Sequence, residues 1–385
     1  MNALSLSKVG FNGFRGLRHL DLDGLGRINI LVGGNNSGKT SVLEALSILC
    51  QPYNPDEWLA MIRRRDFGRL DETLIQSLRW CFAQVAGLNN PDQLIEADCE
   101  FLCLGNTILR GLNVQYAEIS GEPSQSELRR ALGRKQALTP TLEPMRGAEL
   151  THVLNWDEST SSDNALQKLI NIAGNPSIKV WEKLHPYRSR TSTVGPGFDC
   201  ETLTPYSYQI NTLQVKFQSK QIFQQDSPNT LELLRDFDDD IENIDLASFR
   251  GDRPAIYIKH KKLGIAPLSI FGDAMRRAVL LAGTLLSLKD GGILLIDEVE
   301  AGIHVGALGQ VFEWLAKAAQ SLRVQIFVTT HSLEALDAML AVRTKLGEDD
   351  VVVFHLDQTP EITRAKRFSG NLLHRLRFER GLDVR

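Results

Sequence analysis

The sequence lacks the general features of nucleic-acid-binding, disulfide-rich and membrane-spanning proteins. Its formal net charge is −4, so a nucleic-acid site would have to be local. The cysteines show no paired metal-ligand spacing, which favours reduced thiols in the core. No apolar run reaches the ~18 residues that a membrane-spanning helix needs, and the N-terminus lacks a signal-peptide pattern. We therefore expect a cytoplasmic protein that makes no membrane contact.

What the sequence does have is a regular alternation of apolar strands and helices in its last third. Apolar runs end near Asp297, Thr330 and Leu356. Helical periodicity covers 275–288 before the first run, and 305–320 and 332–341 between the runs. This alternation predicts a parallel α/β layer. Residues 229–247 are acidic and predict one or two amphipathic helices, and residues 254–270 predict a hairpin.

A glycine-rich stretch near the N-terminus carries the first chemical motif. It reads GGNNSGKTS and matches G-x-x-x-x-G-K-[ST], between an apolar strand and a helix. Its backbone N–H groups and the helix N-terminus suit phosphate oxygens, the lysine suits β- and γ-phosphates, and the threonine hydroxyl suits Mg²⁺. The expected nucleotide-binding residues are Gly33, Gly34, Asn35, Asn36, Ser37, Gly38, Lys39, Thr40 and Ser41.

Two later strands end in residues that complete such a site. Asp297 follows the apolar run ILLI and is the expected second ligand of Mg²⁺, while Glu298 is the expected base that takes a proton from water. His331 ends the next apolar strand. Because parallel strands bring their carboxyl ends to one edge of a sheet, we expect His331 to contact the γ-phosphate.

The order of these motifs resembles the ABC-type ATPase heads, within the SMC/RecF/OLD-like branch. Two blocks carry the resemblance: residues 14–46, and residues 272–334 with GDAMRR, GGILLIDEVEAGIH and QIFVTTHSLE. It implies an α/β P-loop NTPase with a mixed central sheet, helices on both faces and an inserted, mostly helical arm. Residues 1–50 and 251–385 would form the head, and residues 51–250 the insertion.

The resemblance also implies a second copy of the chain. Ser269, Gly272 and Asp273 occupy the signature position, which in this family caps the γ-phosphate of ATP held by the partner in a head-to-tail dimer. The loop 300–304 would cross the dimer interface. The signature reads SIFGDA and departs from the LSGGQ of transporters, so a transporter engine is not expected. The glutamine-loop residue stays open between Gln51 and Gln209.

The resemblance also implies a role for two residues near the N-terminus. Phe14 and Arg15 stand where N-terminal residues of such heads meet the nucleotide.

The chain lacks two features of its relatives. The insertion has no sustained heptads, which excludes a long coiled-coil rod. The stretch after Gln358 is too short for the Toprim nuclease domain of the OLD family. We therefore expect a separate effector, a nuclease or toxin, in defence against phage or plasmids. The alternatives are a RecF/SMC-like DNA repair ATPase and a low-turnover ATP-bound assembly.

Charged clusters leave nucleic acid open as a partner. We interpret the runs 63–65 and 258–262 as solvated faces, because the net charge is acidic. The acidic cluster near residue 238 is interpreted as a solvated helix end rather than a metal site. That cluster also contains Asp236, Asp239 and Asp240. The basic residues near the C-terminus could bind DNA or a partner chain, or form an exposed face: Lys366, Arg367, Arg375, Arg377 and Arg380.

Overall fold

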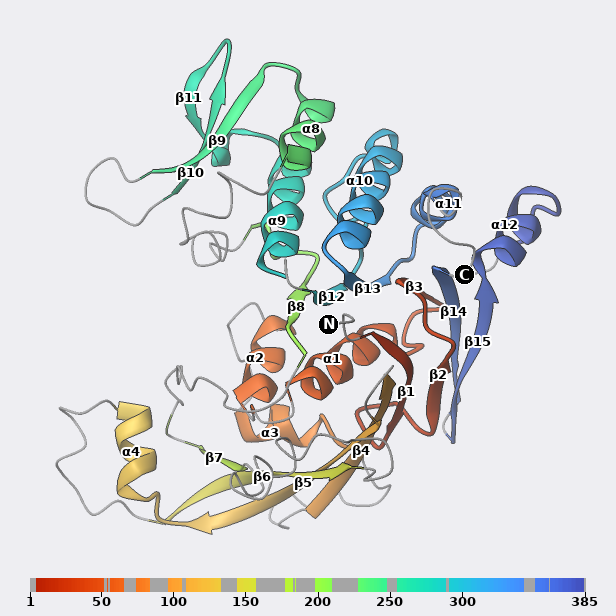
Figure 1. Ribbon diagram of the computed structural model, residues 1–385. Coiled ribbons are helices and arrows are strands. Elements are labelled where there is room, and N and C mark those ends of the chain that lie inside the picture. The colour runs from red at the N-terminus through yellow and green to blue at the C-terminus, as the bar shows by residue number, and fades with distance from the viewer. Residues whose placement is uncertain are drawn as a thin grey trace.

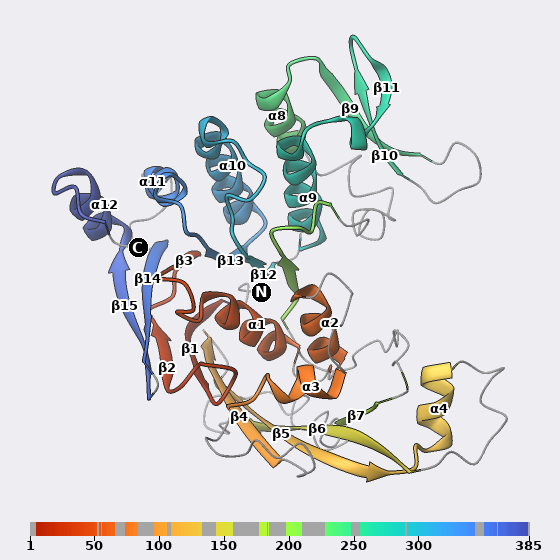
Figure 2. The same cartoon turned by 180° about the vertical axis from the view of Figure 1, so that it is seen from behind.

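The computed structural model describes residues 5–51, 54, 56–65, 74–83, 96–105, 109–132, 144–156, 177–182, 184, 198–209, 228–247, 255–288, 291–342, 350–359 and 361–383. These residues form four layers, shown from two sides in Figures 1 and 2: helices, a six-stranded sheet, more helices and a second six-stranded sheet. The functional motifs gather around the first of these sheets.

The central sheet has the strand order β15-β14-β3-β13-β12-β8. Five of its strands, all but β15, run parallel to one another, and β15 pairs antiparallel with β14. The strands are β3 (Ile28–Val32), β8 (Cys200–Leu203), β12 (Gly292–Ile296), β13 (Val324–Thr329), β14 (Val351–Gln358) and β15 (Thr363–Ser369). Strands β3 and β13 are buried at every residue, as expected for parallel strands covered by helices on both faces.

One face of this sheet packs against a row of C-terminal helices (Figure 1). Alternate residues such as Ile30, Ile326 and Val328 point into this core, together with the apolar sides of the helices. The helices are α8 (Pro228–Phe237), α9 (Asp273–Ser287), α10 (Leu308–Ser321), α11 (Leu333–Val342) and α12 (Gly370–Phe378), and two 3₁₀ turns, Leu268–Ile270 and Val305–Ala307, precede α9 and α10.

The other face packs against N-terminal helices, which a second sheet covers in turn. The second sheet is antiparallel, in the order β2-β1-β4-β5-β6-β7. Leu31 and Phe327 of the central sheet, Leu46 of α1 and Val114 of β5 share this core. The elements are β1 (Leu6–Asn12), β2 (Leu20–Asp23), α1 (Lys39–Cys50), α2 (Asp56–Arg65), α3 (Leu74–Arg79), β4 (Glu96–Gly105), β5 (Leu109–Gly121), α4 (Gln125–Leu132), β6 (Met145–Trp156) and β7 (Ser177–Trp181).

A third, three-stranded sheet lies beyond α8 and α9 (Figure 2). It contains β9 (Ile241–Ala247), β10 (Ala255–His260) and β11 (Gly264–Pro267), and β10 with β11 forms the predicted hairpin. The prediction of helix over 229–247 is wrong in its second half. Ile241 and Ile244 are buried and β9 pairs with β10, so cross-strand packing overrides the local preference for helix.

The described part of the insertion is mixed rather than mostly helical. It holds more strand than helix, because β4, β5 and β6 extend the sheet begun by β1 and β2. One strand of the insertion, β8, pairs with β12 of the central sheet. The division into residues 1–50 with 251–385 and residues 51–250 stays a prediction. None of the described helices combines the length and apolar character needed to cross a bilayer.

Candidate functional site

A cleft of about 1500 Å³ opens where β3, β8 and β12 end. The predicted residues Asn35 to Ser41, Asp297, Glu298 and His331 all line it. Residues that sequence reasoning did not assign to the site line it as well: Gly16, Arg18, Arg64, Arg65, Trp80, Phe82, Thr202, Thr204, Pro205, Tyr206, Gln358 and Thr359. The cleft thus unites parts of the chain that lie far apart in sequence.

The loop before α1 depends on two glycines with positive φ. Gly33 has φ 145° and Gly38 has φ 92°, values that residues with a Cβ rarely adopt. A Cβ at Gly33 would also collide with the carbonyl oxygen of Leu356, and one at Gly38 would lie 2.8 Å from Leu17 Cδ2. The glycines of the motif are therefore required by local geometry, and they turn the chain into the N-terminus of α1, where anions bind.

The ammonium group of Lys39 lies inside this loop. Its Nζ donates hydrogen bonds to the carbonyl oxygens of Gly33 and Gly34, both at 2.8 Å, and to Ser37 Oγ at 3.3 Å. Burial lowers the pKa of Lys39, while the negative charges of Asp297 and Glu298 oppose this shift. The lysine is thus held at the loop as a donor for phosphate oxygens.

Hydroxyl groups connect the loop to the end of β12. Thr40 Oγ1 donates to the two carboxylate oxygens of Asp297 at 3.1 and 3.2 Å, and Thr329 Oγ1 donates to Oδ1 of Asp297 at 2.6 Å. Burial raises the pKa of Asp297, against the lowering effect of these two hydroxyl donors. Thr40 and Asp297 present the hard oxygen atoms that Mg²⁺ prefers, so this pair fits the ion.

Glu298 has an unusual backbone. Its φ is 45°, which is rare outside glycine and is often found at active sites. Its backbone N–H donates to Thr329 Oγ1 at 2.8 Å, so the same threonine holds both acids of the pair. Burial, Asp297 and Glu300 raise the pKa of Glu298, which favours a carboxylate that can accept a proton. Thr329 could have been found as the polar residue that ends an apolar strand.

His331 follows β13 and is exposed at the cleft. Its backbone N–H donates to Glu300 Oε1 at 3.0 Å, and the N–H of Ser332 donates to the same oxygen at 3.2 Å. Ser332 Oγ accepts from the N–H of Ala335 at the start of α11. Glu300 therefore fixes the loop that carries the histidine, a role that the sequence does not reveal.

A buried carboxylate on α1 holds two arginines at the cleft. Glu44 lies one turn after Thr40, and its side chain pairs with Arg15 at 2.7 Å and with Arg65 at 2.6 Å. Arg64 also lines the cleft and pairs with Glu57 at 2.6 Å. The interpretation of residues 63–65 as a solvated run is therefore incomplete: Arg64 and Arg65 pair with acids on α2 and α1 and line the cleft, although Arg65 is exposed.

Phe14 and the two candidates for the glutamine loop do not line the cleft. Phe14 is completely buried and packs against Trp58 in the core, so only Arg15 of that pair reaches the cleft. Neither Gln51, at the end of α1, nor Gln209, which donates to Tyr208 Oη, lines the cleft. Gln358 does so instead.

Gln358 lines the cleft at the end of the last parallel strand, β14. Its Nε2 donates to the carbonyl oxygen of Gly16 at 2.8 Å, which joins β14 to the N-terminal loop. A glutamine at the end of a parallel strand is the signal that could have indicated it.

The signature residues lie outside the cleft of their own chain. Ser269, Gly272 and Asp273 are exposed and do not line it, and a Cβ at Gly272 would meet no atom within 4 Å. Gly272 caps the N-terminus of α9, and Asp273 pairs with Arg276 at 3.3 Å. Contact of these residues with a nucleotide in a partner subunit stays a prediction.

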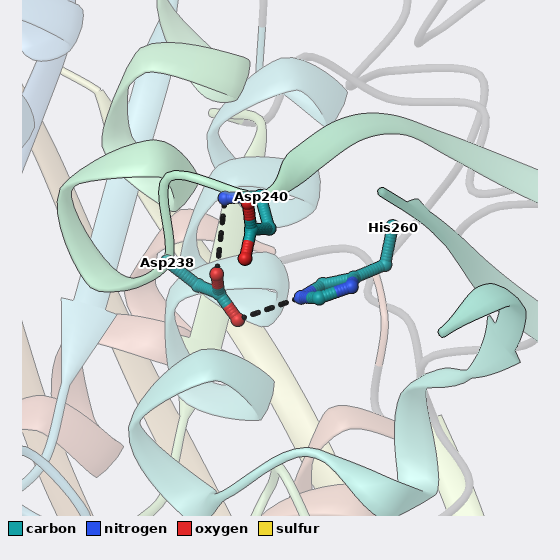
Figure 3. A group of neighbouring side chains, drawn as sticks. All are labelled: Asp238, Asp240 and His260. Carbon is teal, nitrogen blue, oxygen red and sulfur yellow. Dashed lines mark hydrogen bonds and ion pairs between the residues drawn. The ribbon is translucent and has the colours of Figure 1, made fainter. Parts of the chain in front are cut away.

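A second group of acids surrounds His260 near the turn between α8 and β9. Figure 3 shows the carboxylates of Asp238 and Asp240 beside the ring, and the potential ligand atoms lie within 4.8 Å of one another. The N–H groups of Lys262 and Leu263 donate to Nδ1 at 3.1 and 3.2 Å. We therefore assign the ring proton to Nε2, which donates to Asp238 at 3.1 Å.

This tautomer leaves the ring without a free nitrogen lone pair for a metal. Lys262 forms an ion pair with Asp240, so a cation already balances the second carboxylate. The group therefore ties the α8–β9 turn to the hairpin. The interpretation as a purely solvated helix end is incomplete, because the ring of His260 is buried; the side chain of Asp236 lies outside the described residues.

Comparison with known proteins agrees with this geometry. A family described as "AAA domain, putative AbiEii toxin, Type IV TA system" matches residues 28–84 and 175–337, more than half of the chain. The chain belongs to this AAA family. The matched ranges contain the phosphate loop, the acids at the end of β12 and His331, so this AAA protein has an ATPase head of the ABC/SMC/RecF-like kind.

Other similarities cover different shares of the AAA protein. An ATP/GTP phosphatase of Helicobacter pylori is 21% identical over 96% of both chains. The DNA replication and repair protein RecF of Pseudomonas savastanoi pv. phaseolicola is 54% identical over 46 residues, 12% of each chain. Among solved structures, an Smc head bound to the C-terminal winged-helix domain of ScpA aligns over 98% of this chain and 99% of its own, with 12% identity and a TM-score of 0.47.

Proposed function

We propose that the protein binds ATP with Mg²⁺ in the cleft and hydrolyses it to ADP and phosphate. The contact between Thr40 and Asp297 carries this proposal, because it joins the phosphate loop to an acidic strand end and sets Glu298 beside it. Mg²⁺, when bound, would neutralise charge on the β- and γ-phosphates. Glu298 takes a proton from the water that attacks the γ-phosphorus, and His331 contacts the γ-phosphate.

The lysine of the loop provides the test. Lys39→Ala should abolish ATP binding, measured by calorimetry, because it removes the cation nearest the β- and γ-phosphates. Lys317→Ala is the matched control, since Lys317 is 60% exposed on α10 and does not line the cleft. ATP affinity that survives Lys39→Ala would sink the assignment of the phosphate loop.

We further propose that two copies close head to tail around two ATP molecules. The exposed signature residues support this arrangement. So do two exposed apolar side chains: Ile270 (60%), within the signature, and Val305 (58%), directly after the loop 300–304 that is predicted to cross the interface. Glu298→Gln should hold ATP without turnover and double the mass measured by light scattering. Adding Gly272→Arg to Glu298→Gln should keep the chain monomeric with ATP still bound. A dimer that forms despite this change argues against contact through the signature.

The dimer is proposed to act as a switch for a separate effector, a nuclease or toxin, in defence against phage or plasmids. The family description, which names a putative toxin of a type IV toxin–antitoxin system, supports this setting. The test is co-purification with the product of the adjacent gene, with and without ATP. A complex that forms equally with Lys39→Ala contradicts control by ATP.

A RecF-like role in DNA repair is the second candidate. The short, 54% identical match to RecF favours it. Duplex DNA should then stimulate ATP turnover, with a salt dependence that reflects phosphate contacts. Turnover that stays the same with duplex DNA at low salt speaks against this role. A third outcome, one tightly held ATP per chain with almost no turnover, would identify a structural assembly.

A further inference from the structure

The signature helix α9 carries a completely buried arginine. Arg277 lies one turn after Asp273, and its exposed fraction is 0%. Arginine is rarely buried completely, because a cation in the interior needs charged or hydrogen-bonding partners to offset lost hydration. The contacts of this side chain therefore need a physical explanation.

The contacts of Arg277 satisfy only one part of its guanidinium group. Nη1 donates to the carbonyl oxygen of Thr204 at 2.7 Å, and the guanidinium carbon lies 6.0 Å from the ring centre of Tyr208. Nε and Nη2 are buried and donate no hydrogen bond within the described residues. Burial lowers the pKa of Arg277 to about 10, so the side chain stays charged at neutral pH.

Thr204 belongs to a wall of the nucleotide cleft, which follows β8. The neighbouring Arg276 donates to the carbonyl oxygen of Tyr208 at 3.0 Å, and Tyr208 Oη donates to Asp273 at 3.4 Å. The first turns of α9 thus hold the segment 204–208 at several points. A movement of the signature helix would be transmitted to that wall.

A carboxylate in the same region lacks one partner. Glu300 uses Oε1 to hold the backbone of His331 and Ser332, while its Oε2 is buried and accepts no hydrogen bond within the described residues.

Tyr208 connects the segments that carry the two side chains. Its ring centre lies 6.0 Å from the guanidinium carbon of Arg277, and a Cβ at Gly302, two residues after Glu300, would lie 3.2 Å from the same ring. The negative charges of Asp297, Glu300 and Glu298 also raise the pKa of Arg277 against the effect of burial. Two open donors of Arg277 and one open acceptor of Glu300 therefore belong to two segments that pack against the same tyrosine.

We propose that Arg277 is a positioning residue that closes onto Glu300 and thereby couples the signature helix to the loop of His331. The proposal rests on the proposed ATP hydrolysis and adds to it the residue through which α9 acts. Pairing would satisfy the open atoms of both side chains, as charged groups buried in a low-dielectric interior require. It would fix the cleft wall at Thr204 and the histidine loop at the same time.

Kinetics of four variants test the coupling. Arg277→Met removes the charge at similar length, and Glu300→Gln removes the charge of the acceptor. Each should lower kcat by about 10- to 100-fold, as small misplacements do, with the KM for ATP unchanged. The double variant should lose no more than the worse single variant, because both changes break one interaction. Arg277→Lys should recover part of the lost kcat, and Lys317→Met on α10 should match the parent.

Thermal unfolding separates positioning from structural support. Replacing a buried, incompletely paired charge by an apolar side chain is often neutral or stabilising, so Arg277→Met should not lower Tm while it lowers kcat. Parent-like kcat in a folded Arg277→Met protein, losses that multiply in the double variant, or a matching rise in KM would each overturn the proposal. If Arg277→Met does not fold, Arg277→Lys and Glu300→Gln decide by the same kcat and KM criteria. A parent chain without ATP turnover would instead refute the proposed function.

Discussion

Two places in the molecule gather a pair of carboxylates and a histidine, and they differ in how their charge is balanced. At the end of β12, Asp297 accepts hydrogen bonds from the neutral hydroxyls of Thr40 and Thr329. At the α8–β9 turn, Lys262 pairs with Asp240, and the ring of His260 donates to Asp238. The carboxylates at the end of β12 therefore keep negative charge that can bind a cation. The carboxylates at the α8–β9 turn already have partners in Lys262 and His260.

Charge balance, more than the presence of acids, therefore distinguishes the cluster at the end of β12. Burial raises the pKa of Asp297 above its usual range. An acid whose pKa is raised by folding stabilises the folded chain at low pH, and this contribution is lost as the pH rises through the folded-state pKa. The ionised carboxylate of Asp297 therefore lowers the free energy of unfolding at neutral pH, as groups at functional sites often do.

The largest expected effect comes from exchanging one acid at each place. Asp297→Asn should lower ATP turnover by about 10²- to 10³-fold or more, because it removes charge where the metal and phosphates gather. Its Tm at pH 7 should be no lower than that of the parent, since a buried charge is lost. Asp240→Asn should leave turnover unchanged. Equal losses in the two variants, measured in a steady-state phosphate-release assay, would erase the distinction between the two places.

The role of His260 at the α8–β9 turn is tested by the free energy of unfolding. His260→Ala should lower the free energy of unfolding by about 2 kcal/mol, because it removes a buried ring and leaves its hydrogen-bonding partners unsatisfied. Turnover per folded molecule should stay at the parent level. Urea unfolding gives the first quantity, and a phosphate-release assay gives the second. A variant as stable as the parent would show that the ring does not tie the turn to the hairpin.

At the α8–β9 turn we expect no metal binding, and hence no change in Tm. With Asp297→Asn as the background, Mn²⁺ or Zn²⁺ without nucleotide should leave Tm unchanged, because the proton of His260 occupies Nε2. A rise in Tm that disappears when His260→Ala is added would contradict the assigned tautomer. Nitrogen chemical shifts of the ring provide an independent check of that assignment.

The sequence predicts most of what local patterns encode. The glycine-rich loop, the apolar strands and the periodic helices from Ile28 to Cys50 and from Asp273 onward appear within a few residues of their expected bounds. The hairpin of β10 and β11 is confirmed. These features depend on neighbours in the chain, so the sequence determines them directly.

What the sequence could not indicate depends on contacts between distant residues. The basic run 63–65 does not reveal that Arg65 pairs with Glu44 and lines the cleft. Phe14 looks like a nucleotide contact until the second sheet covers it. Likewise, β9 is a strand because β10 pairs with it. Such residues have partners that only the assembled layers supply.

The order of strands in the central sheet has a consequence for how the protein is made. Strand β3 comes from the first tenth of the chain, yet it lies between β13 and β14 from the last fifth. Thr40 and Asp297, which meet in the cleft, are 257 residues apart. In a nascent chain the phosphate loop therefore leaves the ribosome long before β13 and β14 are available to form the sheet around β3. Nucleotide binding should begin only near the end of translation, when β14 has emerged and the late strands can enclose the early one.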